Sequence, residues 1–225
     1  GLDTVAVRMP QHMGALQFLE EAGVPVAAPS ANTSGRPSPT TAQHVYEDLQ
    51  GKIPMILDGG AVTIGLESTI VDVSDEIPMI LRPGAVTKEM IEEVVGQVEI
   101  DPAILHKPTA DFKPKAPGMK YRHYAPKAKL IIAEGDIREE VLAIRQLAYA
   151  AHRQGERVGI IATGETLPFY KYGIVKNIGT RENEKTIARN LYRVLREFDD
   201  EKVDIIYSES FAMQGIGSAI MNRLE

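Results

Sequence analysis

Residues 128–163 read AKLIIAEGDIREEVLAIRQLAYAAHRQGERVGIIAT, and this stretch decides the fold. An apolar run at 130–133 opens it, and a second apolar run at 158–162 closes it. Between them, apolar residues recur at alternating steps of four and three, which is the spacing of one helix face: Ile137, Val141, Ile144, Ala148 and Ala151. Strands that alternate with amphipathic helices predict an α/β fold with a parallel sheet and helices on its faces.

The same alternation continues to the end of the chain. A second helical pattern (Ile187, Leu191, Leu195 and Phe198) precedes an apolar strand at 203–207. The triplet Gly215-Ile216-Gly217 that follows resembles half of a dinucleotide-binding fingerprint. It lacks the third glycine and the later acidic residue, so we interpret it as glycine at a helix entry.

Upstream of this unit lies a basic, proline-rich segment at 106–127. It carries 6 Lys or Arg against 1 Asp or Glu, whereas residues 1–105 carry 5 against 15 and residues 128–225 carry 14 against 15. Its prolines forbid a continuous helix and favour an extended, semi-stiff linker. We therefore predict three parts: a first domain at 1–105, a linker at 106–127 and a second domain at 128–225.

The first 105 residues contain shorter and less regular patterns. We predict strands at 4–8, 24–28, 53–57, 67–73 and 77–82. Helices are expected at 11–22 with Gly23 after its end, from an N-cap at Ser38 through Leu49, and after Thr87.

Composition limits the class of protein. The 225 residues are 44% apolar and 25% charged, contain no cysteine, and have no apolar run near the roughly 20 residues that a membrane-spanning helix needs. These values exclude disulfides, thiolate nucleophiles and cysteine zinc sites. The first residues, GLDTVAVRMP, do not have the pattern of a secretory signal, so we expect a cytoplasmic protein.

Three segments carry polar residues that could bind a ligand. The loop APSANTSG at 28–35 offers hydroxyls, an amide and backbone N–H groups before an expected helix start, which suits an anion, although Ser, Asn and Gly also simply make turns. Arg8 and Arg82 stand at strand ends, where an arginine suits a carboxylate or phosphate, or else forms a solvated surface ion pair. The linker stretch PGMKYRHYAP at 117–126 could stack on and neutralise a nucleotide or RNA. The remaining histidines show no metal-ligand spacing.

Taken in order, AVRMP, APSANTSGRPSPT, ESTIVD, LRPGAV and PGMKYRHYAP resemble one family over essentially the whole chain. They are similar to the two-domain threonylcarbamoyl-AMP synthases, the YrdC/Sua family. This resemblance implies a partial YrdC-like twisted open sheet followed by a Rossmann-like parallel domain.

The resemblance also implies an activity. ATP, L-threonine and bicarbonate or CO2 would condense to threonylcarbamoyl-AMP and pyrophosphate, with Mg2+ accompanying ATP and no covalent enzyme nucleophile. The product would pass to the tRNA threonylcarbamoyl transferase complex for the t6A37 modification of tRNA. Membrane association is not expected, and direct tRNA binding should be weak or absent.

Individual residues match the family pattern. Arg8, the Ala28 backbone and Ser68 resemble the contacts to L-threonine, with Arg8 as the clamp for its carboxylate. The residues that resemble contacts to ATP are Ser30, Asn32, Ser38, Arg82 and Tyr124, and Tyr124 belongs to a linker that folds over the nucleotide. No metal ligand is assigned.

One departure and two alternatives remain. The Lys-x-Arg pair and the first half of the family's YrdC domain have no evident counterpart, so we expect the chain to begin inside that domain and to be active only when the missing half is restored. The alternatives are an RNA-binding module, which the net charge of −10 over residues 1–105 disfavours, and a carbamoyl transferase of related fold.

Overall fold

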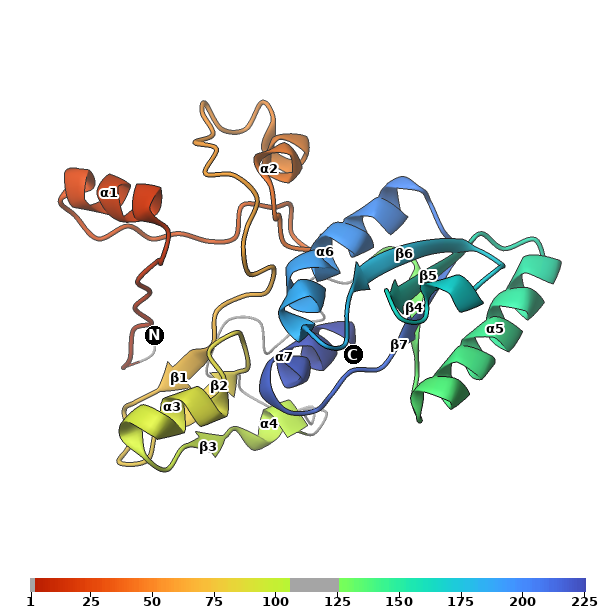
Figure 1. Ribbon diagram of the computed structural model, residues 1–225. Coiled ribbons are helices and arrows are strands. Elements are labelled where there is room, and N and C mark those ends of the chain that lie inside the picture. Colours follow the sequence, from red (N-terminus) through yellow and green to blue (C-terminus); the bar gives the residue numbers. More distant parts are fainter. Residues whose placement is uncertain (1–2, 106–125) are drawn as a thin grey trace.

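The computed structural model describes residues 3–105 and 126–225 (Figure 1). Its first part contains α1 (Met13–Ala22), α2 (Ala42–Leu49), β1 (Ile70–Asp72), β2 (Met79–Arg82), α3 (Lys88–Val95), β3 (Glu99–Ile100) and α4 (Pro102–Leu105). Its second part contains β4 (Lys129–Ala133), α5 (Ile137–Arg153), β5 (Val158–Thr163), the 3-10 turn η1 (Leu167–Phe169), β6 (Ile174–Gly179), α6 (Glu184–Asp200), β7 (Ile205–Glu209) and α7 (Gly215–Leu224).

The second part confirms the predicted parallel α/β unit. Its strands are all parallel and lie in the order β4-β7-β5-β6. Helix α5 covers one face of this sheet, and α6 and α7 cover the other (Figure 1). The prediction missed β6, the edge strand, because Lys176 and Asn177 interrupt its apolar pattern.

Two hydrophobic cores lie on the two faces of this sheet. On one face, the apolar side of α5 packs against Ile160 and Tyr207. On the other face, α6 and α7 pack against Ile161 and Ile206. The alternation of Ile160 and Ile161 between the cores follows from the two-residue period of a strand. Leu66, from the first part of the chain, joins the core of α6 and α7.

The first part forms a smaller sheet than the sequence predicts. Strand β1 pairs antiparallel with β2, and β2 pairs parallel with β3. The strands predicted at 4–8, 24–28 and 53–57 are not formed, because these segments have no ladder partner among the described residues. Their apolar side chains are largely exposed, as at Val7 (89%) and Leu57 (69%).

The helix boundaries confirm some local signals and correct one. Gly23 ends α1 in the left-handed conformation, and Thr87 caps α3. The predicted cap at Ser38 is wrong: α2 begins three residues later than expected, and the Thr41 hydroxyl accepts from the His44 N–H. The Ser38 hydroxyl instead donates to Glu67, so it is not available as a cap.

No helix in the described ranges 3–105 and 126–225 combines the length and apolar character needed to cross a membrane.

Candidate functional site

The loop at 28–38 lies against α6 of the second part of the chain, and its last residues are held by side chains. The Thr33 N–H donates to Asp48 Oδ2 over 3.1 Å, and the Ser38 hydroxyl donates to Glu67 Oε1 over 2.6 Å. The Pro37 carbonyl accepts two hydrogen bonds from Arg196, at 3.0 and 2.7 Å. Segment 33–38 is therefore fixed at its start and at its end.

Asp48 is the buried charge beneath this loop. Its carboxylate accepts from Arg196 at 3.2 and 2.9 Å and forms an ion pair with Arg36. Burial raises the pKa of Asp48, but hydrogen bonds from Arg196 and Thr33 and the two guanidinium charges outweigh it and hold this pKa below its ordinary value. The carboxylate is therefore ionised wherever the protein is folded near neutral pH.

Glu67 forms a second, partly buried acidic centre. Besides the bond from Ser38, it accepts from the Tyr192 hydroxyl at 2.8 Å and from Arg223 Nε at 3.0 Å. Burial raises its pKa, but the Arg223 charge and the hydrogen bonds from Ser38 and Arg223 prevail and lower the pKa overall. Glu67 is thus bonded to two helices of the second part, through Tyr192 on α6 and Arg223 on α7.

Arg82 lies at the end of β2 and is 9% exposed. Its Nε and Nη2 atoms both donate to the Ser68 carbonyl, at 3.0 and 2.9 Å. Gly84 allows the close approach behind this contact, because a Cβ there would lie 2.4 Å from the Thr69 nitrogen. The motif LRPGAV thus fixes the backbone around Ser68, and Arg82 is not a solvated surface side chain.

The predicted site residues are only partly brought together. Ser38, Ser68 and Arg82 meet around residues 67–69, whereas Arg8, Ala28 and Ser30 are exposed in segments without regular structure. No hydrogen bond or ion pair of the described residues joins Arg8 to Ser68. Tyr124 lies outside the described residues.

Asn32 has one buried side-chain atom that lacks a hydrogen-bond partner among the described residues. Its side-chain amide donates to the carbonyls of Thr33 and Arg36 at 3.0 and 3.1 Å, which leaves Oδ1 buried with no partner in the described part of the chain. Arg36 Nε is a second buried atom of the loop without such a partner. One open acceptor and one open donor are consistent with a loop that binds a polar ligand.

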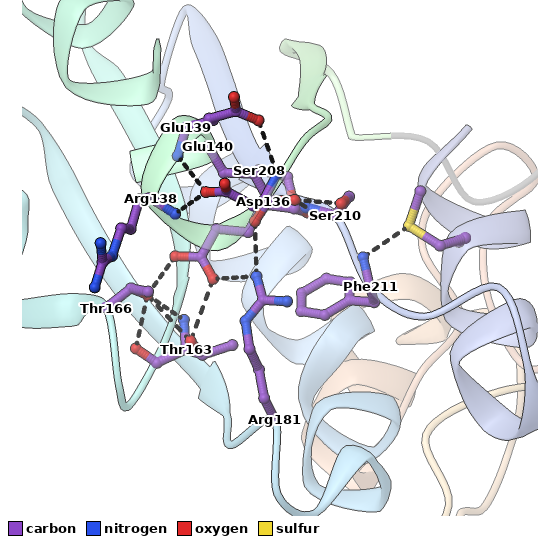
Figure 2. A network of polar contacts seen from close by, with 12 residues as sticks. Asp136, Arg138, Glu139, Glu140, Thr163, Thr166, Arg181, Ser208, Ser210 and Phe211 are labelled. Atoms are coloured by element: carbon purple, nitrogen blue, oxygen red, sulfur yellow. Dashed lines mark hydrogen bonds and ion pairs between the residues drawn. The ribbon is translucent and has the colours of Figure 1, made fainter. Parts of the chain in front are cut away.

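The carboxyl edge of the parallel sheet is the other place where a ligand could bind in this fold class. Glu140 and Glu209 lie there and share the guanidinium of Arg181, at 2.8 and 3.0 Å. Figure 2 shows Glu140 and Arg181 in this polar network. Two buried carboxylates against one cation disfavour a phosphate there. Gly217 confirms the interpretation of its triplet as a helix entry, since a Cβ would lie 2.2 Å from the Ala212 carbonyl oxygen.

Sequence reasoning missed Asp48, Arg196, Tyr192 and Arg223. For Tyr192 and Arg196, the helical spacing could have indicated that they are buried. Tyr192 and Arg196 are four residues apart on the helix whose Leu195 and Phe198 were expected to be buried, so they lie near its apolar side.

His44 provides a test of this electrostatic environment. Burial, and then the Arg196 charge, lower its pKa below 6.5, and its Nδ1 accepts from the Thr40 N–H at 3.2 Å. Because the pKa is lower in the folded state, the stability that His44 contributes is full above about pH 6.5 and is lost as the pH falls towards the folded value. We expect an NMR titration to give a pKa below 6.5, and the loss of stability between pH 7.5 and 5 to be smaller in His44→Asn. A pKa at or above 6.5 would contradict the burial of this ring.

Comparison with known proteins finds two family models in the chain. Residues 86–225 match the family model described as threonylcarbamoyl-AMP synthase, C-terminal domain, and residues 1–84 match the model described as telomere recombination. The N-terminal family domain is therefore represented in the chain, which corrects the expectation that its first half has no counterpart.

Two relatives that match the whole chain carry the same name. The chain is 49% identical to the threonylcarbamoyl-AMP synthase of Bacillus subtilis and 47% identical to that of Pyrococcus abyssi, in each case over its whole length. It spans 63% and 64% of those two relatives. The crystal structure of P. abyssi Sua5 complexed with L-threonine matches all of the chain, and 64% of that protein, with a TM-score of 0.90 at 45% identity. With a family model covering more than half of its length, the chain belongs to the threonylcarbamoyl-AMP synthase family.

Proposed function

We propose that this chain carries out the synthesis of L-threonylcarbamoyladenylate from L-threonine, bicarbonate or CO2, and ATP, with release of pyrophosphate. The observation that carries this proposal is the match of the entire chain to P. abyssi Sua5, whose crystal structure holds L-threonine. The product would serve the t6A37 modification of tRNA in the cytoplasm, through the tRNA threonylcarbamoyl transferase complex. The division into 1–105, 106–127 and 128–225 is part of this proposal.

In this proposal, L-threonine binds at Arg8, Ala28 and Ser68. A guanidinium forms paired hydrogen bonds to a carboxylate, so Arg8 would clamp the carboxylate of the amino acid. Arg82 supports this pocket indirectly, because its two bonds to the Ser68 carbonyl fix the backbone from which the Ser68 side chain projects.

ATP would bind at Ser30, Asn32, Ser38, Arg82 and Tyr124. In the observed arrangement Asn32 and Ser38 have already committed their donors, so both present acceptor oxygens. Acceptors suit a ribose hydroxyl or the adenine amino group better than a phosphate oxygen. Arg36 Nε is a buried donor of this loop that would suit a phosphate.

The chemistry requires positioning more than a reactive side chain. The neutral amine of threonine attacks CO2, and a carbamate oxygen then displaces pyrophosphate at the α-phosphorus. Holding the reactants in line can supply roughly 7–11 kcal/mol of the barrier. Mg2+ would enter with ATP. No cluster of three or more His, Asp or Glu side chains within the described residues could hold a metal ion, so no step is assigned to one.

Pyrophosphate release from Mg-ATP tests this function. We would measure it for this chain and for a version extended to the full length of its relatives, with and without L-threonine and bicarbonate. The expected result is release that requires both co-substrates in the extended protein, with far less in the 225-residue chain. Adenylate formation without threonine would favour a carbamoyl transferase, and release that ignores both co-substrates would overturn the proposal.

A further inference from the structure

Arg196 is buried at the boundary between the two parts of the chain. It lies on α6, its residue is 1% exposed, and its guanidinium makes four hydrogen bonds. All four reach the first part of the chain: two go to the Pro37 carbonyl and two to the Asp48 carboxylate. Arg196, the most deeply buried cation of the second part, therefore makes these four hydrogen bonds to Pro37 and Asp48 of the first part.

The contact has the geometry of a clamp. Asp48 holds the start of segment 33–38 through the Thr33 N–H, and Arg196 holds Asp48 and the Pro37 carbonyl together. A planar guanidinium can bond a carboxylate and a carbonyl in one plane, whereas a lysine ammonium cannot reproduce that fork. Segment 33–38 therefore depends on the side chain of a helix about 150 residues away.

The surrounding packing leaves little room for alternative positions of α6. A Cβ on Gly65 would lie 2.3 Å from the Arg189 carbonyl oxygen, so the chain at 65 rests directly on the α6 backbone. Leu66 beside it belongs to the core of α6 and α7. The next residue, Glu67, bonds Ser38 on one side and Tyr192 and Arg223 on the other.

We propose that Arg196 is a positioning residue for nucleotide binding: it sets the conformation of segment 33–38 from the second domain without touching the ligand. This inference rests on the proposed function, because it assumes that Asn32 and Ser38 contact ATP. It assigns to the second domain a direct role in shaping the loop. The threonine contacts at Arg8 and Ser68 are not linked to Arg196 by any hydrogen bond of the described residues.

The test compares Arg196→Lys with Arg193→Lys. Arg193 is on the same helix, is 39% exposed at its side chain and pairs only with Glu197 among the described residues, so it is a matched control. Binding of ATP and of L-threonine to the chain would be measured separately by calorimetry. Arg196→Lys should weaken ATP binding by roughly ten- to a hundredfold and leave threonine binding within about twofold, while Arg193→Lys should change neither.

Hydrogen exchange supplies a readout that needs no ligand. The amides of 33–36 should exchange faster in Arg196→Lys than in Arg193→Lys, while those of β5 and β7 keep their protection. Equal weakening of ATP and threonine binding, or unchanged exchange at 33–36, would overturn the positioning role. If the unsubstituted protein binds neither ligand even when extended to the full length of its relatives, while the exchange difference is present, the proposed function fails and the positioning contact of Arg196 stands.

Discussion

Replacing Asp48 with alanine is expected to lower the free energy of unfolding by about 3–5 kcal/mol, because it leaves the Arg196 guanidinium buried without its counter-charge. Asp48 lies in the last turn of α2, where the helix dipole disfavours a carboxylate. Its place is explained by its partners, Arg196 and Arg36, and by the Thr33 N–H. Removing it thus breaks contacts on both sides of the boundary.

Urea unfolding followed by circular dichroism measures this loss. The matched control is Glu47→Ala, one residue earlier on α2, where the side chain is exposed and bonds only Gln43 among the described residues. It should change stability by less than about 0.5 kcal/mol. The double variant Asp48→Leu with Arg196→Met should recover much of the loss, since an apolar pair can replace a buried ion pair. A loss at Asp48→Ala no larger than at Glu47→Ala would show that the carboxylate is not buried against Arg196.

The second half of the fold could be predicted because its signals are local. The spacing of Val141, Ile144 and Ala148 is fixed by one helix face, and all three are buried in the core beside the sheet. Ile137, the first residue of α5, was expected on the same face but is exposed. Strand runs such as 158–162 are buried on both faces, which makes them continuous in the sequence. In the first half, the period-two pattern at 4–8 and the mostly apolar run at 53–57 predicted strands, but a strand also needs a hydrogen-bonded neighbour that no local pattern supplies.

The candidate site was predicted in part for the same reason. Motif resemblance identified Ser38, Ser68 and Arg82, which the structure does bring together. It could not identify what holds them. Arg196 and Asp48 are 148 residues apart, and Arg223 and Glu67 are 156 apart. From the neighbouring residues in the sequence alone, each of these four charged side chains would be expected to be exposed to solvent.

Replacing Glu209 with alanine is the second change expected to have a large effect, again about 3–5 kcal/mol of unfolding free energy. Glu209 ends β7 with 0% of its surface exposed. Figure 2 shows Thr163, Thr166 and Arg181, three of the residues that bond Glu209. Its carboxylate accepts from the hydroxyls of Thr163, Thr166 and Tyr170 and from Arg181.

The expected loss is large because water cannot replace the hydrogen bonds of the Glu209 carboxylate unless the edge of the sheet opens. Alanine would remove the shared acceptor of three buried hydroxyls. Thr163 and Thr166 could still bond each other, but the Tyr170 hydroxyl would lose its bond to Glu209, and an unsatisfied buried group costs roughly 1–3 kcal/mol. Arg181 would retain Glu140 and its place over the Phe211 ring, 5.5 Å from the ring centre. The loss should therefore fall mainly on the end of β5, which carries Thr163, and on η1, which Thr166 and Tyr170 flank, and less on α5.

Hydrogen exchange together with urea unfolding distinguishes this network from a general loss of packing. The matched control is Glu182→Ala, beside Arg181 in the same loop, where the side chain is exposed and forms no hydrogen bond or ion pair with described residues. Glu209→Ala should speed exchange at 163–170 more than at 144–151, whereas Glu182→Ala should leave both unchanged. Because Glu209 is far in sequence and in bonding from segment 33–38, ATP binding by the folded fraction should be retained in Glu209→Ala. Loss of ATP binding at full folding would mean that the carboxyl edge of the sheet, rather than the loop at 28–38, holds the nucleotide.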